Sequence, residues 1–234
     1  MSEVKPITNI SHGKLKIKEN ATFIQSEKMH FSPIVVQEFI PASREFPIVF
    51  IKEQDTGRFN AVVLFGLEPG ENLFFDANKW QASYSPLALT LYPFLIHQTE
   101  NSDNALLCID ENSPLINESV GDALFDENGK EMKWLTQKGE AIVNYIEQTK
   151  LTKAFIQLLL ENEILSSQTL SIKIKDQKEF ALNGLYVVDE KKLSNLSDED
   201  FLKIRKSGAL DIIYASINSM QSVNNLVRRK IANS

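Results

Sequence analysis

The chain has 234 residues, of which 43% are hydrophobic and 24% are charged, and its formal net charge is −6. These values are ordinary for a folded globular protein and exclude a disordered composition. The negative charge disfavours nucleic acid and anionic lipid as partners, because binding to phosphate groups needs clustered Lys and Arg. We therefore predict a single domain over residues 1–234.

The sequence also bears on the compartment. Residues 1–8 carry no apolar segment of the kind found in a secretory signal, and no apolar run approaches the roughly 18 residues that a membrane span needs. We expect a cytoplasmic protein without membrane insertion, and leaderless export is the open alternative. The single cysteine, Cys108, excludes an internal disulfide, and its apolar neighbours predict a buried strand thiol.

The first half of the chain, residues 12–126, is predicted to be rich in strands. Charged and apolar residues alternate over residues 14–18, which is typical of a half-exposed strand. Residues 33–44 have the apolar spacing of a short helix, although Pro41 limits its regularity. Further strands are predicted at 48–52, 61–66, 73–76 and 106–110, with a turn at 55–57 between the first two.

The second half, residues 127–234, has helical periodicity interrupted by one hairpin. A polar turn at 126–129 precedes two consecutive amphipathic helices, over residues 134–146 and 151–159. Ser197 precedes three acidic residues and predicts the start of a helix. Alternation over 170–188 predicts a β-hairpin with its tip at 176–178, in which Phe180, Leu182, Tyr186 and Val188 share one face, and a last helix is expected over 210–231.

Helices and strands do not alternate regularly along the chain, which argues against a doubly wound βαβ protein. We therefore predict an α+β fold, with a mostly antiparallel mixed sheet and a helix-rich C-terminal half. The β-rich part is expected over residues 12–126, and the helix-rich part with its hairpin over 127–234.

Motifs that carry chemistry give no positive signal. The sequence has neither a P-loop nor the glycine pattern of a dinucleotide-binding turn, so no cofactor is predicted. His12, His30 and His97 are far apart and lack the spacing of metal ligands, so no metal site is predicted. The apolar surroundings of Cys108 are expected to raise its pKa, which disfavours a nucleophilic role.

One polar and aromatic group, beside the Pro69–Gly70 turn, is a candidate ligand site. Asx side chains there can bind a ligand through hydrogen bonds, while aromatic rings supply flat apolar faces. The competing interpretation is structural, because Asx residues beside such turns usually bond their own loop and the aromatics usually close the core. Arg44 either clamps an anionic ligand or pairs with Glu38 or Glu45. The candidate ligand-binding residues are Arg44, Glu71, Asn72, Asp76, Trp80, Tyr84 and Tyr92.

The chain resembles the SapC family in motifs that follow the family order over nearly its whole length. The motifs are residues 12–17 (His-Gly-Lys-Leu-Lys-Ile), 33–39 (Pro-Ile-Val-Val-x-Glu-Phe), 46–50 (Phe-Pro-Ile-Val-Phe), 66–74 (Gly-Leu-x-Pro-Gly-Glu-Asn-Leu-Phe), Trp80, 84–86 (Tyr-x-Pro), 92–94 (Tyr-Pro-Phe), 108–110 (Cys-Ile-Asp), 124–126 (Leu-Phe-Asp) and 207–214 (Ser-Gly-Ala-Leu-x-x-Ile-Tyr).

The resemblance implies a bacterial source and an association with paracrystalline surface layers. Relatives are often found near outer-membrane TonB-dependent receptors and flavin-dependent halogenase-like proteins. The family supplies no established catalytic residues, so the resemblance does not decide whether the chain is an enzyme.

Two hypotheses follow. The favoured one is a non-catalytic accessory or binding protein with a protein partner of unknown identity, and self-association is also open. The alternative is an enzyme or enzyme subunit that acts on a small molecule, peptide or sugar through residues 72–92. A third hypothesis, a surface-layer subunit, conflicts with the expected cytoplasmic location.

Overall fold

The computed structural model describes residues 3–20, 22–98, 105–174 and 179–233. Its main sheet has the strand order β12 (Leu165–Lys173), β13 (Glu179–Val188), β4 (Ile48–Lys52), β5 (Phe59–Leu64) and β3 (Phe31–Pro33), and all neighbours pair antiparallel. The strand predicted at 48–52 is confirmed with the same bounds. The helical segment predicted within 33–44 is confirmed as a 3₁₀ turn, η2 (Val36–Glu38), followed by α2 (Phe39–Ala42).

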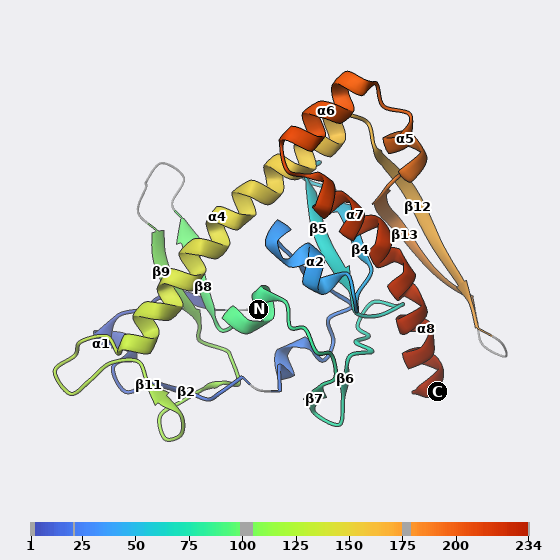
Figure 1. Cartoon of the computed structure of the whole chain (residues 1–234). Coiled ribbons are helices and arrows are strands. Elements are labelled where there is room, and N and C mark those ends of the chain that lie inside the picture. The colour runs from blue at the N-terminus through green and yellow to red at the C-terminus, as the bar shows by residue number, and fades with distance from the viewer. Residues whose placement is uncertain (1–2, 21, 99–104, 175–178, 234) are drawn as a thin grey trace.

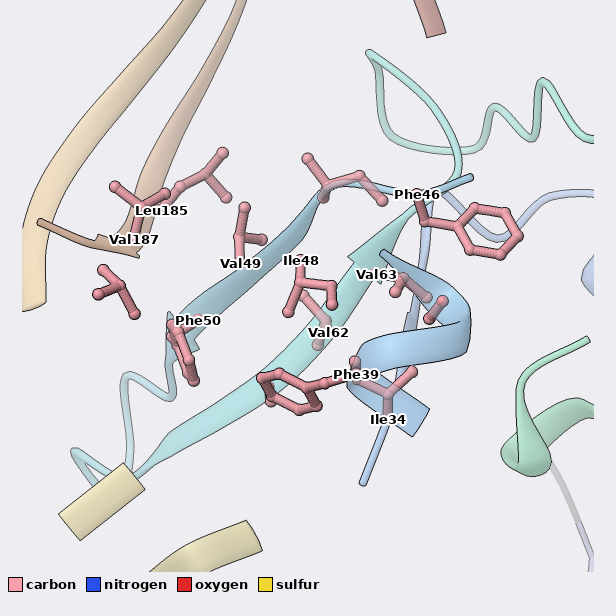
Figure 2. Packing of buried hydrophobic residues seen from close by; sticks show 14 of the residues in the cluster. Ile34, Phe39, Phe46, Ile48, Val49, Phe50, Val62, Val63, Leu185 and Val187 are labelled. Carbon is pink, nitrogen blue, oxygen red and sulfur yellow. The ribbon is translucent and has the colours of Figure 1, made fainter. Parts of the chain in front are cut away.

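The main hydrophobic core lies on both faces of strands β4 and β5. Three successive residues of β4 (Ile48, Val49 and Phe50) are completely buried. Figure 2 shows that Val49 points towards Leu185 and Val187 of β13, whereas Ile48 and Phe50 lie on the side of Phe39. A strand covered on both faces needs a continuous apolar run, which explains why β4 does not alternate.

Three small sheets lie apart from the main one. The first has the order β1 (Val4–Pro6), β9 (Ala105–Asp110), β8 (Phe94–Gln98), and the second has the order β10 (Ile116–Asn117), β2 (Lys16–Ile17), β11 (Asp122–Ala123). The third is a hairpin of β6 (Phe75–Asp76) and β7 (Lys79–Trp80). Two predicted strands, at 14–18 and 73–76, are therefore shorter than expected. Cys108 lies in β9 and is buried, as predicted.

One helix, α4 (Lys133–Glu161), replaces the two consecutive helices that periodicity predicted. Residues 147–150, which lie between the two predicted helices, are exposed or partly exposed and belong to one continuous helix. Leu135 and Ile142 belong to a second hydrophobic cluster, built with the small sheets, whereas Phe155 and Leu159 belong to the main core. Figure 1 shows α4 running from the small sheets at one end to the main sheet at the other.

Four helices end the chain: α5 (Glu190–Ser194), α6 (Asp198–Lys206), α7 (Leu210–Ser219) and α8 (Val223–Ala232). The predicted cap of α6 is confirmed, because Ser197 Oγ accepts a hydrogen bond of 3.1 Å from the amide of Asp200. The single helix expected over 210–231 is interrupted by a 3₁₀ turn, η3 (Met220–Ser222). At this turn Ser219 Oγ accepts a hydrogen bond from the amide of Ile48, which ties the helix pair to β4.

The hairpin of β12 and β13 changes face along its length, unlike the prediction. Its register shifts between Gln168 and Leu170, and Gly184 on the partner strand has φ +73°. Beyond this bulge Leu185 and Val187 are buried, in the opposite phase to Phe180. The predicted tip at 176–178 lies outside the described residues.

Two short helices, α1 (Asn9–His12) and α3 (Leu87–Leu91), and one 3₁₀ turn, η1 (Ile24–Ser26), complete the fold. The architecture is α+β, with several antiparallel sheets and a helical C-terminal region, as predicted. Within the described ranges, no helix is long and apolar enough to cross a membrane.

Candidate functional site

Residues 66–74 form a loop that is closed by its own polar groups. A side chain at Gly66 would place its Cβ 2.2 Å from the carbonyl oxygen of Glu71, so only glycine fits this approach. Glu71 Oε2 accepts a hydrogen bond of 2.9 Å from the amide of Leu67. Buried Asn72 accepts from the amide of Phe74 at 2.9 Å and donates to the carbonyl of Ser26 at 2.7 Å. Both side chains therefore fix the loop to itself and to residue 26.

Trp80 belongs to a cluster of aromatic rings beneath this loop. Its ring centroid lies 5.1 Å from that of Phe65, 6.1 Å from Phe46 and 6.2 Å from Phe74. The indole Nε1–H donates to the carbonyl of Tyr84 at 3.0 Å. Asp76 is exposed on the β6–β7 hairpin. The contacts of Asn72 and Trp80 are thus those that the structural interpretation predicts. Their role in binding a ligand stays a prediction.

Tyr84 is hydrogen-bonded to a buried carboxylate, that of Glu38, which the sequence analysis did not include among the candidate site residues. Glu38 is only 1% exposed, and it accepts hydrogen bonds from Tyr84 Oη (2.9 Å), the amide of Leu87 (2.8 Å) and the amide of Val35 (3.0 Å). One sequence signal could have identified Glu38. It lies three residues after Val35, the position from which a Glu side chain reaches back to the start of a helix. Glu38 therefore joins η2 to α3 and to the loop before it.

Burial dominates the electrostatics around Glu38. It raises the pKa of the Glu38 carboxyl above its ordinary value, although its three donors act in the opposite direction. Burial and the nearby Glu38 charge raise the pKa of the Tyr84 hydroxyl. The same two causes raise the pKa of Tyr145, on α4, to about 12. Both tyrosine hydroxyls are thus protonated at neutral pH, and that of Tyr84 donates to Glu38.

The raised pKa of Glu38 predicts a pH-dependent contribution to stability. Between the pKa of the unfolded chain and the higher pKa of the folded state, the folded protein binds more protons, so stability falls as pH rises through this window. The stability cost of Glu38→Gln should therefore be largest below about pH 4.5 and decrease as pH rises. Urea unfolding of both proteins across a pH series tests this, and a cost that grows with pH would contradict it.

Arg44 does not take part in this group. Its side chain is exposed, and within the described ranges it forms no ion pair with Glu38 or Glu45. Glu45 instead accepts hydrogen bonds from the amides of Ser83 and Tyr84, at 3.0 and 3.4 Å. The expected pairing of Arg44 is therefore not found. Its role as an anion clamp stays a prediction.

Helix α8 braces the loop from outside. The Arg229 guanidinium lies 4.3 Å from the ring centroid of Phe74 and donates to the carbonyl of Gln81 at 3.1 Å. Lys230 forms ion pairs with Glu71 and, at 3.6 Å, with Glu68. The loop around residue 70 is thus held on both sides, by the aromatic cluster and by the basic end of α8.

Neighbouring arginines on α8 offer a matched test of this brace. Arg229→Met should lower the free energy of unfolding by about 1–2 kcal/mol, because it removes a cation–π contact and a hydrogen bond to a carbonyl. Arg228→Met removes the same charge from an exposed position and should change stability by less than about 0.5 kcal/mol. Urea denaturation measures both values. Equal effects of the two substitutions would show that charge, and not the contact with Phe74, matters.

Tyr92 lies in a different place, at a cavity of about 530 Å³ between the second small sheet, the α3–β8 segment and the first turns of α4. Its hydroxyl donates to Asp110 Oδ2 at 3.4 Å, and burial raises its pKa. Phe23 also lines the cavity, and its ring centroid lies 5.9 Å from that of Trp80. The structure therefore groups Glu71, Asn72, Trp80 and Tyr84 around the loop, and it places Tyr92 at the cavity.

The protein is thus of the α+β class, and its antiparallel sheets frame a braced aromatic loop and a separate cavity. The model of the SapC family matches residues 7–226, so the chain belongs to the SapC family, as its motifs predicted. Comparison with curated proteins and with solved structures gave no match. The matched region contains the loop, the aromatic cluster and the cavity.

Proposed function

We propose that this SapC-family protein is a non-catalytic accessory protein that acts in the cytoplasm and binds a protein partner of a surface-layer or outer-membrane TonB-dependent uptake system. The observation that supports the proposal best is the bracing of the loop around residue 70. Glu71, Asn72 and Tyr84 direct their polar atoms to the fold itself. A general acid or base must instead reach a substrate with a free polar atom.

A braced loop suits recognition because little conformational freedom is lost on binding. The tip residues Pro69 and Gly70, and Asp76 on the adjacent hairpin, are exposed. The aromatic cluster and α8 hold these exposed residues in place from below and from the side. A preorganised surface of this kind binds a partner at a lower entropic cost than a flexible loop.

Affinity purification from the source bacterium tests the proposal. Immobilised wild-type protein should retain a partner protein, and the purified partner should then bind the wild-type protein directly. The double variant Pro69→Arg/Asp76→Arg should not bind this partner. Asp55→Arg changes an exposed charge on the β4–β5 turn and should bind as the wild type does. If the partner is a second copy of the chain, the same assay recovers it. Equal retention by all three proteins, or no retention by the wild type, would refute the proposed surface.

The alternative function, an enzyme or enzyme subunit acting on a small molecule, peptide or sugar beside halogenase-like proteins, is favoured by the cavity at Tyr92. Its volume of about 530 Å³ falls in the range of about 300–1,000 Å³ that is usual for small-molecule sites. Turnover by purified protein alone, abolished in folded Tyr92→Phe, would favour this alternative over the binding function.

Resistance of the protein to protease added to intact cells tests the proposed cytoplasmic location.

A further inference from the structure

The cavity beside Tyr92 has aromatic walls from three separate segments. Tyr92 and Phe94 come from the α3–β8 segment, Trp134 from the first turn of α4, and Phe23 from the segment before η1. Phe94 and Trp134 meet edge to face, with ring centroids 5.9 Å apart. Walls of this kind favour a flat apolar body as the occupant.

One positive charge is set into these walls. Lys138 lies one turn beyond Trp134 on α4, and its side chain is partly buried. Its Nζ donates to the carbonyl of Thr90 at 3.2 Å, and within the described ranges Lys138 forms no ion pair with an acidic side chain. Burial lowers the pKa of this ammonium group, which means that the charged form lacks full compensation from its surroundings.

The remaining charges of the lining are exposed: Lys18, Glu19 and Asp122. Exposed charges are screened by solvent and salt, so Lys138 dominates the charge that an occupant meets inside the cavity. The exposed charges still sum to one negative charge, because Lys18 offsets only one of the two carboxylates, and this disfavours a second negative charge on the occupant. A monoanion is thus better matched than a phosphate ester, which carries close to two negative charges at neutral pH.

We propose that this cavity binds an aromatic monocarboxylate, with its carboxylate on the Lys138 ammonium and its ring between Tyr92, Phe94 and Trp134. Lys138 keeps two further N–H donors for the carboxylate beside the one given to Thr90. The site is separate from the loop around residue 70. It requires neither the protein partner nor a catalytic step.

The two tryptophans give a direct readout. The indole N–H of Trp134 donates to the carbonyl of Ala123 at 2.9 Å beside the cavity, whereas that of Trp80 donates to Tyr84 in the main core. In nitrogen–proton correlation spectra, titration with 4-hydroxyphenylacetate should shift the Trp134 indole signal saturably and leave the Trp80 signal nearly unchanged. Trp134→Phe assigns the two signals.

Charge-matched probes and variants test the proposed recognition. The neutral 4-hydroxyphenylacetamide and the cationic tyramine should each bind at least about tenfold more weakly than the carboxylate. Lys138→Met should weaken carboxylate binding by about tenfold or more, and Lys138→Arg should retain most of it. Lys150→Met, which removes an exposed charge from the same helix, should bind as the wild type does. Thermal unfolding establishes that each variant is folded.

Three results would overturn the proposal: no saturable shift of the Trp134 signal through the millimolar range, equal binding of the carboxylate and its amide, or tighter binding of tyramine. Equal affinities of folded Lys138→Met and Lys150→Met would also overturn it. The partner-binding experiment on Pro69 and Asp76 is unaffected by any of these results, because those residues lie outside the cavity.

Discussion

Replacing Phe46 with alanine is expected to lower the free energy of unfolding by about 3–5 kcal/mol, as large-to-small substitutions of buried aromatic residues do. Phe46 is completely buried, and its ring centroid lies 4.6 Å from that of Phe74 and 5.4 Å from that of Phe65. Its removal leaves a void where the main sheet meets the aromatic cluster. Equilibrium unfolding in urea, with the slope of the transition unchanged, measures the loss.

An exposed apolar residue provides the control for this substitution. Ile10 is 98% exposed, and Ile10→Ala should change the free energy of unfolding by less than about 0.5 kcal/mol. If Phe46→Ala costs less than about 1 kcal/mol, the aromatic cluster is not the packed unit described above.

Glu38→Ala is the second substitution with a large expected effect, a loss of about 3–5 kcal/mol. It leaves Tyr84 Oη and the amides of Val35 and Leu87 without their acceptor in a buried place. Each unsatisfied donor costs about 1–3 kcal/mol, and some relaxation around the shortened side chain reduces the sum. Urea unfolding at constant pH gives the value.

Glu45 makes a suitable comparison because its carboxylate also accepts from two amides, those of Ser83 and Tyr84. The contacts with Ser83 are exposed, so water replaces the lost acceptor, and Glu45→Ala should cost about 1 kcal/mol or less. Similar costs for the two substitutions would mean that burial does not set the importance of Glu38. Tyr84→Phe, combined with Glu38→Ala in a double-mutant cycle, isolates the Tyr84–Glu38 hydrogen bond.

Sequence predicted the elements whose signals are local. The continuous apolar run of β4, the Ser197 cap and the turn at 126–129 each depend on a few neighbouring residues, and each is found as expected. The continuity of α4 was missed because its polar middle turns give the same pattern as a loop. The change of face in β13 was missed because it depends on a bulge at Asn183 and Gly184, which is defined only by the pairing of β13 with β12.

In the candidate site too, local signals were recognised and contacts between distant parts of the chain were not. Asn72 and Trp80 were recognised as notable, but their partners Ser26 and Phe23 lie about fifty residues earlier in the chain, beyond the reach of local patterns. Lys138 was missed because nothing distinguishes it from the other lysines of an amphipathic helix. Its burial results from α3, which packs against that turn of α4.

The uninterrupted helix α4 sets the distance and the relative rotation between the two hydrophobic clusters. Ile142 is buried in one cluster and Phe155 in the other, with no loop between them to absorb a change in length. Inserting one residue between these positions would rotate everything downstream by about 100° and displace it by about 1.5 Å. A stripe of apolar side chains that is now buried would then face solvent, so the segment between Ile142 and Phe155 tolerates no change in its length.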